Sequence, residues 1–166
     1  MDKEIPEIVR DAYKSLPHFK DGRIDYSDAE KAPVVVVFLK YGDEILILKR
    51  SDRVGTHQGR WGTVAGYLDE LKPVVEKAFE EIEEETGIGR EKIAKVLKNG
   101  VYKFRSESED ICYTTHLVLA ILKERTDVKL SWEHTDYKWV KISNSDRYLS
   151  HNASEELKKV LYSLGK

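Results

Sequence analysis

A run of carboxylates between Glu80 and Glu85 is the part of this sequence best suited to chemistry. Five of these six positions are glutamates, and the run is followed by Thr86 and Gly87. Like charges one turn apart on a helix cost roughly 0.2–0.5 kcal/mol per pair. A helix that concentrates so many of them either accepts that cost on a solvated face or uses the carboxylates together.

Helical geometry groups three of these glutamates. At about 100° per residue, Glu81, Glu84 and Glu85 fall within roughly one quarter of the circumference, beside the apolar stripe. Glu83 projects away from them, and Glu80 lies at the edge of the group. Three convergent carboxylates favour a hard cation between them, of the kind that oxygen ligands select: Mg²⁺, Mn²⁺ or Ca²⁺. An acidic, solvated helix face is the alternative interpretation.

The spacing of the same residues resembles the Nudix box, which runs Gly, five residues, Glu, seven residues, Arg-Glu, aliphatic, any, Glu-Glu, any, Gly, aliphatic. The positions that match in register are Gly66, Glu81, Ile82, Glu84, Glu85, Gly87 and Ile88. The flanks QGRWGTVAGYLDE and SWEHTDYKWVKI also resemble this family. The chain is therefore identified as a member of the MutT-like Nudix hydrolases with a degenerate box, over about residues 33–164.

This resemblance implies a fold and an activity. The fold is a Nudix-type α/β/α sandwich with a mixed, mostly antiparallel sheet. The activity is hydrolysis of a nucleoside diphosphate linked to another moiety, by water attack at phosphorus, with Mg²⁺ or Mn²⁺ as cofactor. By position, Glu81, Glu84 and Glu85 are expected to be catalytic and to bind the metal, with the backbone carbonyl of Ala65 as a further ligand. A weak or inactive nucleotide-binding module on the same fold is the alternative.

The proton acceptor has two candidate locations, the box and a later acidic loop. In the box the candidates are Glu84 and Glu85. In the loop they are Glu107, Glu109 and Asp110, for which an exposed hairpin tip is the alternative interpretation. The sequence does not choose between them.

Substrate binding is expected at Arg50 and Arg60, which lie on segments leading to the box and could bind phosphate. Trp61 could stack on a base, although a tryptophan before a buried strand also fits the core. Four histidines without metal-ligand spacing receive no role: His57, His116, His134 and His151.

Two box positions depart from the family pattern. Lys72 stands where the family has Glu, and Glu80 stands where it has Arg. Because these positions commonly face each other as an ion pair in the family, the charges are expected to be swapped and the pair kept. The swap is also expected to deprive Glu81 of a cationic neighbour.

The chain pattern predicts the elements that position these residues. PVVVVFLK and ILILKR, joined by YGDE, indicate a hairpin, and residues 73–86 a helix that ends before Gly87. Strands follow in IAKVLKNGVYKFRS, ICYTTHLVLAIL and YKWVKI, and ASEELKKVLYSL is a closing helix. The lead-in, residues 1–31 with a short amphipathic helix, is expected to be accessory to a domain over 32–166.

Composition limits the remaining possibilities. The 166 residues, 40% of them hydrophobic, suit one domain, and a net charge of −2 gives no broad attraction to nucleic acid. Neither a signal peptide nor a membrane span is visible, so a cytoplasmic location is expected. The single cysteine, Cys112, is expected to be a small buried hydrophobe. The expected partner is a small nucleotide-type molecule, with no membrane or nucleic acid, and a homodimer is allowed.

Overall fold

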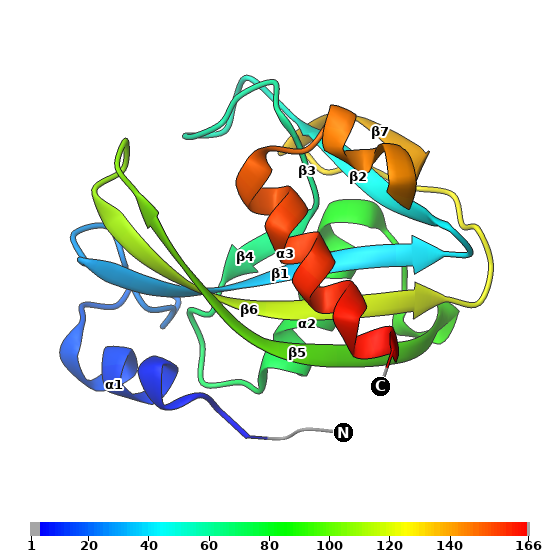
Figure 1. Cartoon of the computed structure of the whole chain (residues 1–166). Coiled ribbons are helices and arrows are strands. Elements are labelled where there is room, and N and C mark those ends of the chain that lie inside the picture. Colours follow the sequence, from blue (N-terminus) through cyan, green and yellow to red (C-terminus); the bar gives the residue numbers. More distant parts are fainter. Residues whose placement is uncertain (1–3, 166) are drawn as a thin grey trace.

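The computed structural model describes residues 4–165, and within them seven strands form one mixed sheet (Figure 1). The strands are β1 (Lys31–Tyr41), β2 (Glu44–Arg50), β3 (Trp61–Gly62), β4 (Val64–Tyr67), β5 (Ile93–Ser106), β6 (Ile111–Leu122) and β7 (His134–Lys141). The α-helices are α1 (Glu7–Ser15), α2 (Val74–Thr86) and α3 (His151–Leu161). Short 3₁₀ helices occupy Arg90–Lys92, Ile142–Arg147 and Tyr162–Gly165.

Strand β1 organises the sheet, whose order is β3-β2-β1-β6-β5. It pairs in parallel with β6 along one edge, while its other edge pairs antiparallel with β4 and then with β2. The further pairs, of β2 with β3 and β7 and of β5 with β6, are antiparallel. The predicted mixed and mostly antiparallel sheet is therefore confirmed.

Both faces of the sheet are covered, which explains the continuous apolar run in β1. Val35 and Val37 belong to a core cluster with residues of α1 and α2, whereas Val36 and Phe38 belong to a second cluster with residues of α3. A strand buried on both faces needs apolar residues at every position rather than at alternate ones. The result is the predicted α/β/α sandwich, with α3 on one side and α1 and α2 on the other (Figure 1).

Local turn chemistry sets the ends of the elements near the site. The β1–β2 hairpin closes through Gly42, whose φ is 60°, a left-handed conformation that glycine adopts without strain. Helix α2 follows Pro73 and ends at Gly87, whose φ is 72° and whose N–H donates to the Glu83 carbonyl at 2.9 Å. Both elements match the sequence-based prediction.

The lead-in packs against the domain. Val9 and Ala12 of α1, with Ile24 and Tyr26 beyond it, belong to the same core cluster as the buried residues of α2. The division at residue 31 stays a prediction, and the ends of both predicted parts, residues 1–3 and 166, lie outside the described residues. Among the helices of the described part, none is long and apolar enough to cross a membrane.

The expectation of a buried Cys112 is wrong. Its side chain is exposed near the start of β6, where its Sγ lies 3.5 Å from Nη1 of Arg105 on β5. Ile111 and Tyr113, on either side of Cys112, pack on the cluster that contains residues of α1 and α2, so the alternation of the strand points the thiol to the other face. On that face the β6 residues of the second cluster begin only at Leu117. A thiol before that covered stretch has no core to enter.

The inner side of α3 carries an unusual carboxyl group, Glu156, which is 5% exposed. Burial raises the pKa of Glu156 to about 7. A raised folded-state pKa means that the folded protein keeps this proton while the unfolded chain, with a pKa near 4.5, releases it. Stability from this group is therefore lost as the pH rises from about 4.5 to about 7.

Glu156→Gln should remove that loss. At pH 8 the variant should have a free energy of unfolding up to about 3 kcal/mol larger than the wild type, and near pH 4 the two should agree. Urea denaturation across this pH range measures the difference. Glu155→Gln is the control, because Glu155 is a partly exposed neighbour whose ion pair with Lys158 spans 3.3 Å. A difference between Glu156→Gln and wild type that does not change with pH would contradict the interpretation.

Candidate active site

Helix α2 carries two of the predicted glutamates into the protein. The helix packs its apolar side, including Ala78 and Ile82, on the sheet. Glu81 and Glu85 flank that side, so their side chains are only 13% and 2% exposed. Glu84 stays on the exposed side of the helix. The structure therefore brings Glu81 and Glu85 together and leaves Glu84 at the rim.

Gly66 on β4 makes room for the Glu81 carboxyl group. A Cβ at this position would lie 2.5 Å from Cδ of Glu81 and 2.6 Å from its Oε1, well inside van der Waals contact. The first glycine of the box is thus required by close approach of the strand to a helix side chain, since its φ is not in the left-handed region. Sequence spacing alone gave the match at Gly66 without this reason.

Burial dominates the protonation of both acids. It raises the pKa of Glu81, the charges of Glu84 and Glu133 raise it further, and a hydrogen bond with Glu85 opposes the rise. Burial also raises the pKa of Glu85, to which the neighbouring Glu81 adds. Two carboxyl groups share a site from which water is largely excluded, so charge on one disfavours charge on the other.

These residues suit a hard cation. Oε2 of Glu85 is buried and has no hydrogen-bond partner, and every side-chain donor of the box is a carboxylate oxygen, the donor type that Mg²⁺ and Mn²⁺ prefer. Among residues 4–165, no three His, Cys, Asp or Glu side chains are already gathered closely enough to hold a metal. The donor chemistry fits, and the exposed Glu84 is the member that would have to turn inward.

The segment around the start of β7 adds residues that the sequence analysis missed. His134 is buried, and its Nε2 lies 3.8 Å from Oε1 of Glu85. Burial and then the charge of Arg50 lower the pKa of His134 to about 4, so the ring is neutral at pH 7 and this contact is not an ion pair. Glu133 is close enough to Glu84 for that charge to raise its pKa, after burial.

Strand pairing explains how these residues meet. Arg50 at the end of β2 pairs with His134, and Ser51 N–H donates to the Glu133 carbonyl at 2.8 Å. This places Arg50, one of the predicted substrate-binding residues, beside the acidic site, where its Nε also donates to the Thr56 carbonyl at 2.9 Å. The pairing joins segments distant in sequence, so no local pattern could have predicted it.

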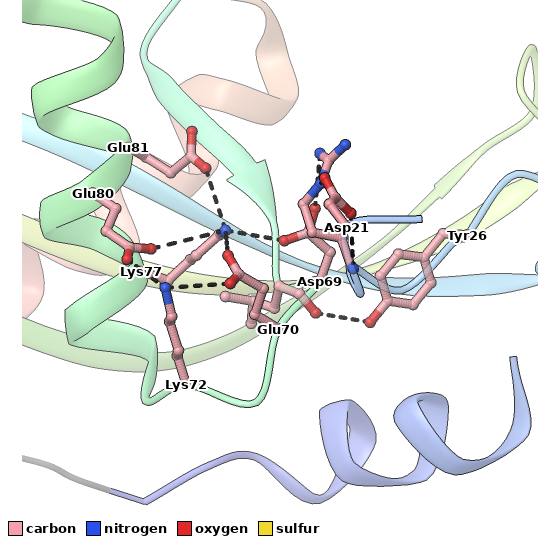
Figure 2. Close-up of polar contacts among 10 residues, drawn as sticks. Asp21, Tyr26, Asp69, Glu70, Lys72, Lys77, Glu80 and Glu81 are labelled. Atoms are coloured by element: carbon pink, nitrogen blue, oxygen red, sulfur yellow. Dashed lines mark hydrogen bonds and ion pairs between the residues drawn. The ribbon is translucent and has the colours of Figure 1, made fainter. Parts of the chain in front are cut away.

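The swapped ion pair at the two divergent box positions is present. Nζ of Lys72 lies 2.6 Å from Oε1 of Glu80 and 3.3 Å from Oε2 of Glu70 (Figure 2). The expectation that the swap deprives Glu81 of a cation is wrong, because Nζ of Lys77 lies 3.9 Å from Oε1 of Glu81. Lys77 stands four residues before Glu81, a spacing that places both on one helix face and that the sequence analysis overlooked.

The acidic loop between β5 and β6 makes its contacts elsewhere. Asp110 bonds Arg105, and Glu109 accepts a hydrogen bond from the Tyr113 hydroxyl. Oε1 of Glu109 also lies 3.4 Å from Nε2 of His57. Glu107 is exposed at the hairpin tip. A catalytic role for these three loop acids stays a prediction.

Two further residues predicted to bind substrate, Trp61 and Arg60, make their contacts away from the buried pair Glu81 and Glu85. Trp61 packs on the cluster that contains α3 residues, with its ring edge-on to Tyr148 at 6.1 Å between centroids. Arg60 is exposed beside the loop that contains His57. The backbone of Ala65 lies beside Glu85 and lowers the pKa of that acid through a hydrogen bond, while the role of the Ala65 carbonyl as a metal ligand stays a prediction.

Known structures share the fold of this chain. A MutT protein from Methanosarcina mazei Go1 superposes with a TM-score of 0.66 at 22% identity, covering 84% of this chain and 99% of that one. An Ap4A hydrolase from C. elegans, solved as a binary complex, gives 0.63 at 22% identity, covering 82% and 98%. A bifunctional NMN adenylyltransferase/ADP ribose pyrophosphatase from Francisella tularensis, complexed with AMP and an Mn ion, gives 0.66 at 17% identity, covering 82% and 42%.

The sandwich with its box helix is thus the fold of Nudix hydrolases. The sequence profile of the NUDIX domain matches residues 30–163, which is most of the chain. A comparison of this chain with curated protein sequences found no match. The chain belongs to the Nudix family, whose hydrolases act on diphosphate bonds.

Gly66→Ala should disable the site while leaving the fold intact. The new methyl group must push the Glu81 carboxyl group aside, and a displacement of about 1 Å can cost about 100-fold in turnover. Steady-state kinetics and a thermal melt separate activity from stability. Gly62→Ala is the matched control, because nothing lies within 4 Å of a Cβ at Gly62. Equal activities of the two variants would show that the close approach to Glu81 is irrelevant.

A double-mutant cycle tests the swapped pair. Lys72→Glu and Glu80→Arg should each destabilise the protein, because each places like charges together, and the double reversal should recover about 0.5–1 kcal/mol, the range for a partly exposed pair. Urea denaturation at low salt and in 1 M NaCl measures the coupling, which salt should weaken. Additive effects at low salt would mean that the two side chains do not interact in solution.

Proposed function

We propose that this chain is a metal-dependent pyrophosphohydrolase that cleaves a nucleoside diphosphate linked to another moiety, by attack of water at phosphorus. The observation that carries the proposal is the buried pair Glu81 and Glu85, with one oxygen of Glu85 unpartnered. Burying two acids together weakens a fold, since each must lose water beside a like charge. A divalent cation held by these oxygens would remove that penalty.

Glu81, Glu84 and Glu85 would hold Mg²⁺ or Mn²⁺, with the carbonyl of Ala65 as a further ligand. Such a metal supplies positive charge to the phosphate oxygens and acidifies bound water. The Mn ion in the Francisella tularensis structure supports this choice of cation. Neutral His134 against Glu85 suits the same role, because it adds no charge that would compete with the metal.

A carboxylate of the chain must accept the proton of the attacking water. Glu84 and Glu85 are the candidates from the box. Glu133 joins them, because it is partly buried and close enough to Glu84 and Glu81 for their charges to interact. Glu109 is the loop acid that best fits as an alternative, since it borders the cavity described next.

Hollows beside the site support a nucleotide-type substrate. A cavity of about 420 Å³, within the usual size for small-molecule pockets, is lined by Tyr26, Tyr67, Asp69 and Tyr113 among others. Asp69, which lines this aromatic cavity, lies 3.0 Å from Nζ of Lys77, and the same atom lies 3.9 Å from Oε1 of Glu81. The cavity is therefore close to one of the buried acids, and it offers π-faces to a base. A second hollow of about 440 Å³ shares Thr56 and Glu109 with the first and contains Arg60.

Roles in substrate binding follow from these positions. We assign Arg50 and Arg60 to phosphate groups, because Arg50 stands beside the acids and Arg60 opens onto the second hollow. Trp61 remains a candidate for stacking through its exposed part. The aromatic cavity is the better place for a base, since Trp61 packs on Tyr148.

Glu84→Gln and Glu85→Gln should each lower turnover by at least about 100-fold. Each substitution removes a negative charge that attracts the metal, while the glutamine side chain keeps the shape of the glutamate. The assay offers ADP-ribose, diadenosine tetraphosphate, NADH, a nucleotide sugar and dATP with Mg²⁺ or Mn²⁺, and measures released products. Glu83→Gln is the control, since Glu83 is exposed on the opposite side of α2. Without metal, Glu85→Gln should melt at the same or a higher temperature than the wild type.

Two results would contradict the proposal. Tight binding of one of these compounds without hydrolysis would favour the alternative, a nucleotide-binding module. A sharp drop in the metal-free melting temperature of Glu85→Gln would mean that the Glu85 carboxylate stabilises the fold, and is not kept there for a cation.

A further inference from the structure

Lys77 is a buried cation on α2, one helical turn before Glu81 (Figure 2). Only 8% of its side chain is exposed, although an ammonium group loses strong hydration on burial. Four carboxylates compensate that loss. Nζ lies 2.9 Å from Glu70, 3.0 Å from Asp69, and 3.9 Å from each of Glu80 and Glu81.

The two short contacts fix where this cation stands. Glu70 and Asp69 belong to the loop that follows β4, not to the helix, so they hold the end of the side chain from the opposite side. At 3.9 Å, the carboxylates of Glu80 and Glu81 are attracted to the ammonium group but are too far from it for a hydrogen bond. Lys77 is therefore anchored by the loop and presented to the box.

The loop is itself held by the N-terminal segment. Ile24 N–H donates to the Asp69 carbonyl at 2.8 Å, and the buried hydroxyl of Tyr26 donates to the Leu68 carbonyl at 2.8 Å. Arg23 Nη1 lies 3.6 Å from Oδ2 of Asp69. Arg23, Ile24 and Tyr26 precede the part of the chain that the NUDIX profile matches. A series of contacts thus runs from residues 23–26 through Asp69 to Lys77 and Glu81.

Glu81 lies between this cation and a strand. On one side the backbone of Gly66 approaches its carboxyl group so closely that a Cβ there would have to displace it. On the other side stands Lys77. The lysine at position 72 does not duplicate this arrangement, because its side chain is 37% exposed and its ion pairs are with Glu80 and Glu70.

We propose that Lys77 is a positioning residue that holds the Glu81 carboxylate in one orientation against Gly66. The inference rests on the proposed function, since it assigns Lys77 to the support of a glutamate of that site. The carboxylate of Glu81 can adopt few orientations, because the anchored charge of Lys77 lies on one side of it and the backbone of Gly66 on the other. Lys77 acts through Glu81 and does not reach the substrate.

The test compares Lys77→Met, Lys77→Arg and the matched control Lys72→Met. Each is assayed with Mn²⁺ on whichever of ADP-ribose, diadenosine tetraphosphate and dATP the wild type hydrolyses best. Lys77→Met should lower kcat by about 10- to 100-fold with KM within about threefold, because orientation and not binding is lost. Lys77→Arg should stay within about fivefold of wild type, and Lys72→Met within about twofold.

Crystal structures of the same variants give a readout that does not depend on turnover. The Glu81 carboxylate should move by about 1 Å or adopt several orientations in Lys77→Met, and should stay in place in Lys72→Met. If Lys77→Met does not fold, the double variant Lys77→Met with Asp69→Asn replaces it. That pair removes the cation together with the more buried of its two anchoring carboxylates, and should give the same loss.

The outcomes separate this inference from the proposed function. Equal kcat values in folded Lys77→Met and Lys72→Met, or an unmoved Glu81 in both crystals, would overturn the inference while leaving the hydrolase intact. A wild type that hydrolyses none of the compounds would overturn the proposed function. The position of Glu81 in the crystals would still decide the role of Lys77.

Discussion

Burial of like charge on the inner side of α2 is the constraint on which the rest of this structure depends. Glu81 and Glu85 are nearly removed from water, and the charge of Glu81 makes ionisation of Glu85 more costly. The surrounding residues answer that problem in different ways. Gly66 gives space, His134 contributes a neutral ring, and Lys77 brings the nearby positive charge.

The layered sheet makes this burial unavoidable. Helix α2 must press its apolar side on β1 and β4, and the two acids flank that side. The pairing of β4 with β1 places Gly66 opposite Val35, so the backbone of β4 lies against the Glu81 carboxyl group from the side of the sheet. A surface helix with the same sequence would leave its glutamates solvated. It is the packing, more than the number of acids, that creates a site suited to a cation.

Much of the fold was predictable because its signals are local. The β1–β2 hairpin and both ends of α2 depend on Gly42, Pro73 and Gly87, which act within their own turns. The Lys72–Glu80 pair was expected because the box positions are known to face each other. Lys77 could have been found from its spacing to Glu81, but its anchor could not, since Asp69 reaches it only after the loop folds back.

Other features depend on contacts between distant segments. Arg50 meets His134 through the β2–β7 pairing, and nothing in either segment indicates the other. Cys112 looked like a core residue because it lies in an apolar strand, yet its side chain points to the face on which the buried part of β6 begins only at Leu117. The burial of Glu156 also depends on contacts with distant segments, because the sequence of an amphipathic helix does not show that packing on the sheet encloses one of its acids.

The pairing of β1 with β6 also bears on how the protein is made. Each partner residue on β6 lies roughly eighty positions after its counterpart on β1, among the slowest kinds of contact to form. During synthesis β1 can pair early with β2 and β4, but its other edge stays bare until β6 has been translated. An apolar strand with an open edge is a target for aggregation. The nascent chain is therefore most exposed to misassembly before its second half emerges from the ribosome.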